Sequence, residues 1–185
     1  MQKKAYIIAI NAVSGGGKTT ITNNLKNQLP NAKALYFDDR NYDLDSGIDD
    51  ICKWIDEGAD VNRFNLDLLI NDIEASISDG VEYIILDYPF GYRHHKIAPY
   101  IDLSIFIDTP LDIALARRII RDYDMTIIAD IFEGMKQYLS EGRNAYLYGI
   151  RSALSDSDFV VDGSKSADEI VGSIKNIIFK INNSK

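Results

Sequence analysis

The sequence predicts an α/β fold in which helices cover both faces of a parallel sheet. Short apolar runs of strand length alternate along the chain with longer stretches whose apolar residues recur at helical spacing. Near-continuous apolar runs are typical of strands that are buried on both faces. A chain of 185 residues with 46% apolar and 26% charged residues is long enough for one domain with a sizeable core. We therefore expect a single domain over residues 1–185.

Each element has a local reason. A strand at 5–10 leads into a glycine-rich turn and a helix that ends at Leu29, before a Pro30-Asn31 turn. The other strands are expected at 33–37, 81–87, 100–108 and 157–163. The other helices are expected at 48–57 (apolar stripe Ile48, Ile51, Cys52 and Ile55), 66–77, 111–123, 125–148 and 167–181. Thr109 is expected to cap the helix that begins at Pro110.

The stretch AVSGGGKTT at residues 12–20 matches the pattern G-x-x-x-x-G-K-[ST], except that Ala12 holds the first glycine position. Alanine is tolerable there if its φ is negative. Consecutive glycines can aim backbone N–H groups at phosphate oxygens, Lys18 would reach the β- and γ-phosphates, and the Thr19 hydroxyl would bind Mg²⁺. The predicted nucleotide-binding residues are Ser14, Gly15, Gly16, Gly17, Lys18, Thr19 and Thr20. The alternative, a turn with a solvated Lys18, is disfavoured because strand, loop and helix follow in the required order.

Carboxylates end two of the expected strands. Asp38 and Asp39 follow the second strand, and Asp87 closes the third. The carboxyl ends of parallel strands meet at the ligand-binding edge of an α/β sheet, so these side chains are expected near the γ-phosphate. Asp39 and Asp87 are expected to help hold Mg²⁺. The alternative for Asp87 is a solvated residue at the end of a core strand, and Asp38, Asp39 and Asp87 all remain candidates for a general base.

The acidic charge is concentrated in residues 38–60, which hold nine acids against Arg40 and Lys53. The simplest interpretation is a solvated helix face. If the segment instead lined an acceptor cavity, it would favour a neutral or cationic alcohol. The net charge of −8 and the pI near 4.7 argue against a nucleic-acid partner and favour a small-molecule substrate.

Basic residues are expected at the same edge of the sheet. Arg117, Arg118 and Arg121 lie at the far end of helix 111–123. They could complement the helix dipole, but three arginines within five residues predict that at least one folds over the phosphates as an arginine finger. The loop after Asp87 carries His94 and His95, whose adjacent side chains are expected to project in different directions and so to share no metal.

Other features bear on location and partners. The single Cys52 cannot form an internal disulfide, and two histidines provide no zinc cluster, which favours the reducing cytoplasm. No apolar run approaches the roughly 18 residues of a membrane span. The first residues resemble a signal peptide, but cleavage would destroy the glycine-rich loop. The sequence leaves the oligomeric state open, with a homo-oligomer among the options.

With these residues identified, the chain resembles the uridine kinase-like branch of the P-loop kinases, which includes nicotinamide riboside kinase and phosphoribulokinase. The resemblance covers about residues 5–122 and rests on residues 12–20, on Phe37-Asp38-Asp39, on the strand 84–87 and on the stretch 106–122. A weaker similarity occurs at 160–163. Such kinases often have Glu-Gly after the third strand and Arg-Gly-Arg in the lid, where this chain has Asp87-Tyr88-Pro89 and Asp122-Tyr123-Asp124.

The resemblance implies a single P-loop NTPase domain with a five-stranded parallel sheet, a helical lid at about 117–126, and transfer of the ATP γ-phosphoryl group to a hydroxyl. It implies Asp38 as general base, Arg117, Arg118 and Arg121 as lid arginines, and Gly163 and Ser164 beside the adenine. A nucleoside-like acceptor is expected, with ATP and Mg²⁺ as cofactors. The alternative is an ATP-binding protein or regulatory ATPase without an acceptor; a GTPase is disfavoured because no Asn-Lys-x-Asp stretch is present.

Overall fold

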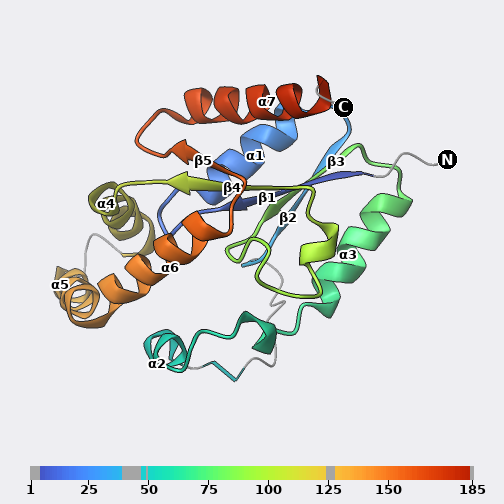
Figure 1. Cartoon of the computed structure of the whole chain (residues 1–185). Helices are drawn as coiled ribbons and strands as arrows, with labels where there is room; N and C mark the ends of the chain where they lie inside the picture. Colours follow the sequence, from blue (N-terminus) through green and yellow to red (C-terminus); the bar gives the residue numbers. More distant parts are fainter. Residues whose placement is uncertain (1–4, 39–46, 49, 124–127, 184–185) are drawn as a thin grey trace.

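Five parallel strands form one sheet in the computed structural model of the chain, which describes residues 5–38, 47–48, 50–123 and 128–183 (Figure 1). The strands are β1 (Tyr6–Asn11), β2 (Ala32–Tyr36), β3 (Tyr83–Asp87), β4 (Leu103–Asp108) and β5 (Phe159–Asp162). Their order across the sheet is β2-β3-β1-β4-β5, and all neighbouring strands are parallel. The predicted five-stranded parallel sheet is confirmed.

The central strand β1 lies between β3 and β4, at the point where the order of the strands reverses direction across the sheet. Ile8 is in register with Ile85 of β3 on one side and with Leu103 of β4 on the other. The chain therefore crosses over β1 between β3 and β4. In open α/β sheets, such a switch point opens a crevice at the carboxyl ends of the strands, where ligands bind.

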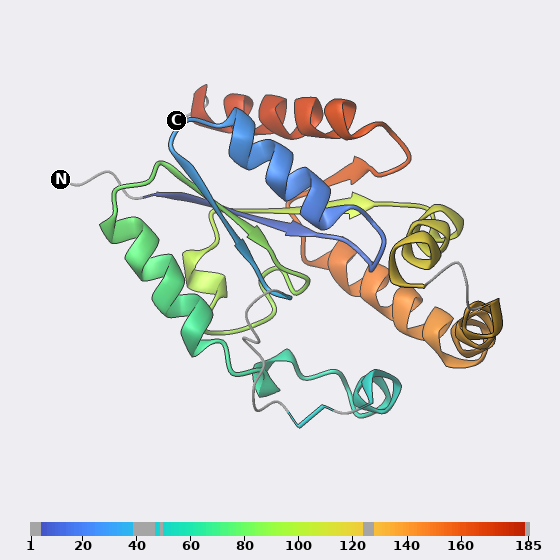
Figure 2. The same cartoon turned by 180° about the vertical axis from the view of Figure 1, so that it is seen from behind.

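Alternate residues of β1 face two separate apolar layers, as expected for a strand buried on both faces. Ile7 packs in one layer with residues of α3 (Asp67–Ser78), whereas Ile8 packs in the other with residues of α1 (Lys18–Gln28) and α7 (Ala167–Asn183). Figures 1 and 2 show α1 and α7 over one face, and α3 and α6 (Arg143–Ser155) over the other. None of the described helices is both long and apolar enough to cross a bilayer.

The remaining elements connect the strands to these layers. Helix α4 (Leu111–Asp122) follows β4 directly, the short turn η1 (Val61–Arg63) precedes α3, and the turn η2 (Ala98–Tyr100) precedes β4. Helix α2 (Ile51–Asp56) is shorter than expected, and its predicted apolar stripe is confirmed in part, because Ile48 and Ile55 pack against the core but Ile51 does not. Trp54 is the buried residue, at 6% exposure, whereas Ile51 is 49% exposed. The large Trp54 ring is therefore the main apolar contact of this short helix.

The helical stretch expected at 125–148 is confirmed for its described residues, but it is not one regular α-helix and it extends further, to Ser155. Residues 125–127 lie outside the described part, and the rest divides into α5 (Ile128–Gln137), the π-helical turn η3 (Tyr138–Gly142) and α6. In η3, the Tyr138 ring is buried and packs edge-on against the Tyr146 ring, with centroids 5.4 Å apart. A π turn changes the helical phase without interrupting the helix, so a count of apolar residues at 3.6-residue spacing does not reveal it.

Candidate functional site

The glycine-rich turn between β1 and α1 has the backbone geometry that phosphate binding requires. Gly15 and Gly17 have φ values of +77° and +96°, in the region that side chains other than glycine rarely adopt. Gly17 is the N-cap residue of α1, so the free N–H groups of the first helical turn point out of the helix at the end of the loop. The positive end of the helix dipole adds to their attraction for anions.

The same turn is packed too tightly for larger residues. A Cβ atom on Gly15 would lie 2.1 Å from the Ala114 carbonyl oxygen of α4, and one on Gly16 would lie 2.7 Å from the Val13 carbonyl oxygen. Ala12, at the first glycine position of the motif, is not among the residues with positive φ, so the expectation that alanine is tolerated there is confirmed. The loop therefore keeps its shape despite the substitution.

Asp87, at the end of β3, meets the first turn of α1. The Thr19 hydroxyl donates to Asp87 Oδ2 at 2.6 Å, and Lys18 Nζ lies 3.7 Å from Asp87 Oδ1. Asp87 is 3% exposed, and burial raises its pKa, although Lys18 and the Thr19 hydrogen bond act in the opposite direction. The predicted meeting of Lys18, Thr19 and Asp87 thus occurs, at the ligand-binding edge of the sheet.

These oxygens fit a magnesium ion. Within the described part of the chain, Asp87 Oδ1 is buried without a hydrogen-bond donor, and the Thr19 hydroxyl lies beside the same carboxylate. Mg²⁺ prefers oxygen ligands and is usually held by one or two carboxylates together with substrate phosphates. The described residues contain no group of three or more His, Cys, Asp and Glu side chains that could bind a metal alone. Asp39, the other predicted magnesium ligand, lies outside the described residues.

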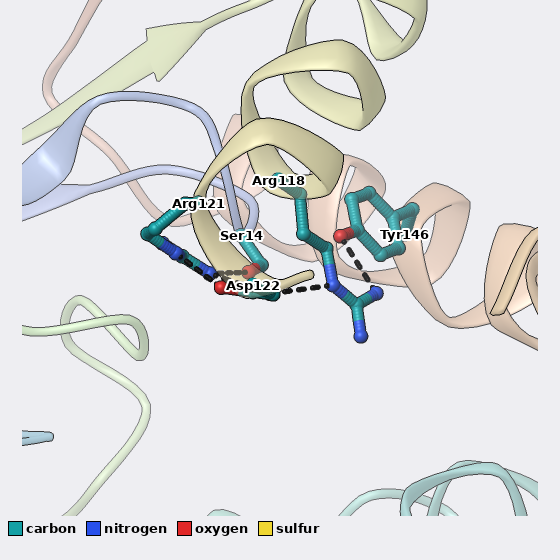
Figure 3. Close-up of polar contacts among 5 residues, drawn as sticks. All are labelled: Ser14, Arg118, Arg121, Asp122 and Tyr146. Carbon is teal, nitrogen blue, oxygen red and sulfur yellow. Dashed lines mark hydrogen bonds and ion pairs between the residues drawn. The ribbon is translucent and has the colours of Figure 1, made fainter. Parts of the chain in front are cut away.

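The arginines of α4 divide between two partners (Figure 3). Arg121 Nη2 donates to Ser14 Oγ of the loop at 3.3 Å, and its guanidinium also donates to both oxygens of Asp122 at 2.6 and 3.1 Å. Arg118 donates to Asp122 at 3.3 Å and to the Tyr146 hydroxyl at 3.2 Å. The hydrogen bonds from Arg121 lower the pKa of Asp122. Asp122 therefore couples two arginines, a role that the sequence analysis did not assign.

A cavity of about 930 Å³ joins the loop to the rest of the site. One end is lined by the loop and by three of the predicted side chains, Asp38, Arg117 and Arg121. The Arg117 Nη1 atom is 3.8 Å from the position of a Cβ on Gly17, so this guanidinium lies over the N-cap of α1. Arg118 does not line the cavity, because it turns toward α6.

The other end of the cavity is aromatic and apolar. Its lining residues include Ile51, Trp54, Ile55, Phe64, Pro89, Phe90, Arg93 and Tyr148, and Ala145, Tyr146, Gly149 and Ser152 of α6 also line the cavity. The Phe64 and Phe90 rings lie 4.8 Å apart, and Trp54 packs edge-on against Phe64. The sequence analysis named none of these side chains individually as lining a site, because they come from segments far apart in the chain whose relative geometry is not encoded in local spacing. Their one local signal is an unusual density of aromatic residues near the ends of β2 and β3.

Arg93 is fixed at this end by neutral partners. Its Nη2 atom donates to the Ala59 carbonyl and to the Tyr148 hydroxyl, both at 2.9 Å, and its guanidinium carbon lies 5.6 Å from the centre of the Tyr148 ring. These hydrogen bonds are with neutral groups, and the nearby Asp156 carboxylate, whose pKa the Arg93 charge acts to lower, partly balances the cation. Arg93 therefore brings a positive charge to this end of the cavity.

Within the described residues, the acids of the segment 38–60 do not form this wall. Of those that the structure describes, only Asp38 lines the cavity. Asp50 caps α2 by accepting from Cys52 N and Lys53 N, and Asp60 caps η1 by accepting from Asn62 N. Capping of the backbone explains why Asp50 and Asp60 occupy these positions. The idea that acids of this segment repel a phosphorylated acceptor is therefore not supported by the described residues.

The prediction that the adjacent histidines diverge was wrong. The His94 and His95 rings are stacked, with centroids 5.2 Å apart and an angle of 14° between their planes. His94 is buried, its Nε2 lies 3.1 Å from the Phe64 carbonyl oxygen, and burial lowers its pKa. In a turn, unlike a strand, adjacent side chains can lie on one side. Neither ring lines the cavity.

Gly163 and Ser164 lie outside the cavity lining. The Ser164 N–H and hydroxyl both donate to Asp162 Oδ1, at 2.9 and 2.6 Å, which closes the turn after β5. Gly163 N donates to the Asp108 carbonyl oxygen at 2.9 Å, at the end of β4. Their expected place beside an adenine ring stays a prediction.

Comparisons with known proteins agree with this geometry. Residues 31–168 match the Phosphoribulokinase / Uridine kinase family. A uridine kinase of Streptococcus mutans is 29% identical over 146 residues, which cover 66% of this chain and 70% of that protein. A uridine kinase of Clostridium tetani is 21% identical over an alignment of 208 residues, which covers 97% of this chain and 99% of that protein.

Solved structures show a similar fold. Shikimate kinase from Bacteroides thetaiotaomicron superposes with a TM-score of 0.58, at 11% identity, over 94% of this chain and 98% of its own. At this identity, the similarity concerns the arrangement of the sheet and its helices, and not the residues that line the cavity.

The two arginine environments predict different kinetic effects. Arg121→Ala removes a cation that contacts the phosphate loop, so we expect ATP turnover to fall by about 10²-fold or more. Arg118→Ala removes a cation that does not line the cavity and that contacts Tyr146 and Asp122, so a fall of less than about tenfold is expected. The measurement is the steady-state rate at saturating ATP. Arg151→Ala, on the exposed side of α6, is the matched control. A wild-type rate for Arg121→Ala would contradict this assignment.

Asp87→Asn tests the magnesium site. The substitution keeps the size of the side chain but removes its charge, so the Mg²⁺ concentration for half-maximal turnover should rise by about tenfold or more. Because burial raises the pKa of Asp87, protonation on acidification should produce the same weakening at higher pH than for an exposed aspartate.

Asp156 provides the control for Asp87. Burial also raises its pKa, but its carboxylate accepts from Tyr92 N and does not line the cavity. Asp156→Asn should leave the Mg²⁺ requirement unchanged. Equal Mg²⁺ titration curves for Asp87→Asn and the wild type would remove Asp87 from the metal site.

Proposed function

Because the chain belongs to the phosphoribulokinase/uridine kinase family, we propose that it transfers the γ-phosphoryl group of ATP to a hydroxyl of a nucleoside-like acceptor. Its family is one of small-molecule kinases, and its fold is similar to that of a solved small-molecule kinase. The observation that carries the proposal is the single cavity that extends from the glycine-rich loop to an aromatic wall. Such a cavity has room for both a nucleotide tail and a second small molecule.

The phosphate end offers charge neutralisation, which is the main requirement of phosphoryl transfer. The loop N–H groups and Lys18 would bind the β- and γ-phosphates, with Ser14, Gly15, Gly16, Gly17, Thr19 and Thr20 forming the rest of the cradle. Arg117 and Arg121 would offset charge on the transferring group. Mg²⁺, held by Thr19 and Asp87 with help from Asp39, supplies further charge neutralisation when bound.

Asp38 is our candidate general base. It lines the same cavity as Lys18 and follows β2, whose end is beside the end of β3. Its carboxylate would accept the proton of the acceptor hydroxyl as the hydroxyl oxygen attacks phosphorus in line. Asp87 is less suited to this role, because its carboxylate is already engaged by Thr19 and Lys18.

The aromatic end favours an acceptor with a planar ring. The edges and faces of Trp54, Phe64 and Phe90 can pack against a base, and aromatic contacts of this kind favour flat molecules over flexible polar ones. The relatives named uridine kinases also support a nucleoside acceptor, because uridine is a nucleoside. Arg93 could donate to an oxygen on such a ring.

We assign residues 1–185 to one kinase domain with a lid at about 117–126, whose residues 124–126 lie outside the described part. Gly163 and Ser164 are retained as candidates for the adenine side. A cytoplasmic location, the absence of a nucleic-acid partner and a homo-oligomeric state are retained as sequence-based predictions.

The competing function is an ATP-binding protein or regulatory ATPase without an acceptor. A protein of that class needs the loop, the magnesium site and the arginines, but it needs no second apolar end to the cavity. The aromatic wall therefore favours transfer to an acceptor.

An acceptor screen tests the proposed function. ADP release should accelerate in the presence of at least one nucleoside from a panel that also includes sugars and vitamins. Lys18→Ala serves as the blank, because loss of the loop cation should reduce turnover by about 10³-fold. Lys26→Ala, at the exposed end of α1, should retain the wild-type rate. Hydrolysis that no panel member accelerates would favour the regulatory ATPase.

Asp38→Asn separates the base from the nucleotide site. Turnover should fall by about 10²-fold or more, with ATP affinity changed by less than about threefold, because the base acts on the acceptor and not on ATP. Asp50→Asn is the control, since asparagine also caps helices and Asp50 lies outside the cavity lining. Unchanged turnover in Asp38→Asn would transfer the role to Asp39 or Asp87.

A further inference from the structure

Thr109 connects the end of β4 to the glycine-rich loop. Its hydroxyl donates to the Gly16 carbonyl oxygen at 2.9 Å, and the residue is 1% exposed. The prediction that Thr109 caps α4 was wrong, since the N-cap residue is Pro110 and no side chain caps this end of the helix. The hydroxyl is therefore committed to the loop, 93 residues away in the sequence.

This hydrogen bond determines which way one peptide unit of the loop faces. The described part of the chain contains no cis peptide bond, so the Gly16 carbonyl and the Gly17 N–H point in opposite directions. Holding the carbonyl toward Thr109 directs the Gly17 N–H away from Thr109, toward the cavity that Gly17 lines. A peptide between two glycines has little intrinsic preference for this orientation, because glycine adopts both signs of φ.

The surroundings keep the Thr109 side chain in place. Thr109 N donates to the Ile107 carbonyl oxygen at 3.0 Å. A Cβ atom on Gly163 would lie 2.0 Å from Thr109 Oγ1 and 2.8 Å from Thr109 Cα. The absence of a side chain at Gly163 thus leaves the space that the hydroxyl occupies. Gly163 has a structural reason to be glycine that does not involve a nucleotide base.

We propose that Thr109 is a positioning residue for triphosphate binding, which it supports by turning the Gly16–Gly17 peptide so that its N–H faces the phosphates. The inference rests on the proposed function, because it takes the loop to be the phosphate site. Thr109 does not line the cavity and so acts only through the loop. The Ala114 carbonyl, packed closely against Gly15, gives the loop a second contact with the same β4–α4 junction.

Thr109→Val tests the inference with inorganic tripolyphosphate and Mg²⁺ as the probe, measured by calorimetry. Valine matches threonine in shape but leaves the buried Gly16 carbonyl without its donor. We expect the dissociation constants for tripolyphosphate and for ATP both to rise by about tenfold or more. Thr109→Ser, which keeps the hydroxyl, should bind within about threefold of the wild type.

Thr22→Val is the matched control. Thr22 is fully buried in α1 close to the same loop, and within the described residues its hydroxyl has no hydrogen-bond partner. The same substitution there removes a buried hydroxyl without touching the loop carbonyl. Thr22→Val should leave both dissociation constants unchanged. A loss of affinity equal to that of Thr109→Val would attribute the effect to general packing and overturn the proposal.

Kinetics distinguish a positioning role for Thr109 at the phosphate site from a general role in the stability of the fold. Thr109→Val should raise the KM for ATP while the KM for the acceptor stays within about twofold, because the peptide faces the nucleotide. Equal increases in both KM values would overturn the proposal.

If Thr109→Val does not fold, Gly163→Ala takes its place, since the added methyl displaces the hydroxyl without removing it. Tripolyphosphate has no adenine, so its weaker binding to Gly163→Ala would support the proposal, and wild-type binding would overturn it.

Two failures remain distinguishable. If Lys18→Ala weakens tripolyphosphate binding but Thr109→Val does not, the inference about Thr109 is wrong and the phosphate site stands. If the wild-type protein binds neither tripolyphosphate nor ATP, the proposed function is wrong, and the inference that rests on it is wrong as well.

Discussion

The close packing of the glycine-rich loop against the β4–α4 junction is the constraint on which the site depends. Backbone atoms of Gly15 and α4 approach so closely that a single methyl group would collide with the Ala114 carbonyl. Behind the loop, the Thr109 hydroxyl occupies a space that Gly163 leaves open. Gly15 and Gly163, from two parts of the chain, therefore both act by lacking a side chain: Gly15 lets two backbone segments approach, and Gly163 leaves room for the Thr109 hydroxyl.

This packing has an electrostatic consequence. A loop without side chains exposes N–H groups, and the start of α1 adds its dipole, so the site attracts anions in a chain with a net charge of −8. Lys18, Arg117 and Arg121 increase that attraction, whereas Asp87 and Asp122 moderate it. The two carboxylates differ in environment. Burial raises the pKa of Asp87 beside Lys18, and hydrogen bonds from arginine lower the pKa of Asp122.

The second end of the cavity depends on a different kind of contact. Trp54, Phe90 and Tyr148 come from α2, from the turn after β3 and from α6, and they meet only because these elements pack at the same edge of the sheet. The rings present flat apolar faces and edges to the cavity. By contrast, the phosphate end uses backbone donors. One cavity thus combines an anion site with an aromatic wall.

The sequence by itself determined the parallel sheet, the loop at residues 12–20 and the carboxylate at the end of β3, because strand periodicity and the P-loop pattern are local in the chain. The sheet edge then places Lys18, Thr19 and Asp87 together, since parallel strands end on the same side. Only the tertiary structure decided that Arg121 meets Ser14 while Arg118 meets Tyr146, and that Thr109 serves the loop and not its own helix. It also decided the π turn at Tyr138 and the aromatic wall around Phe64. These contacts depend on side-chain direction and on packing between distant segments, and neither residue type nor local spacing specifies those.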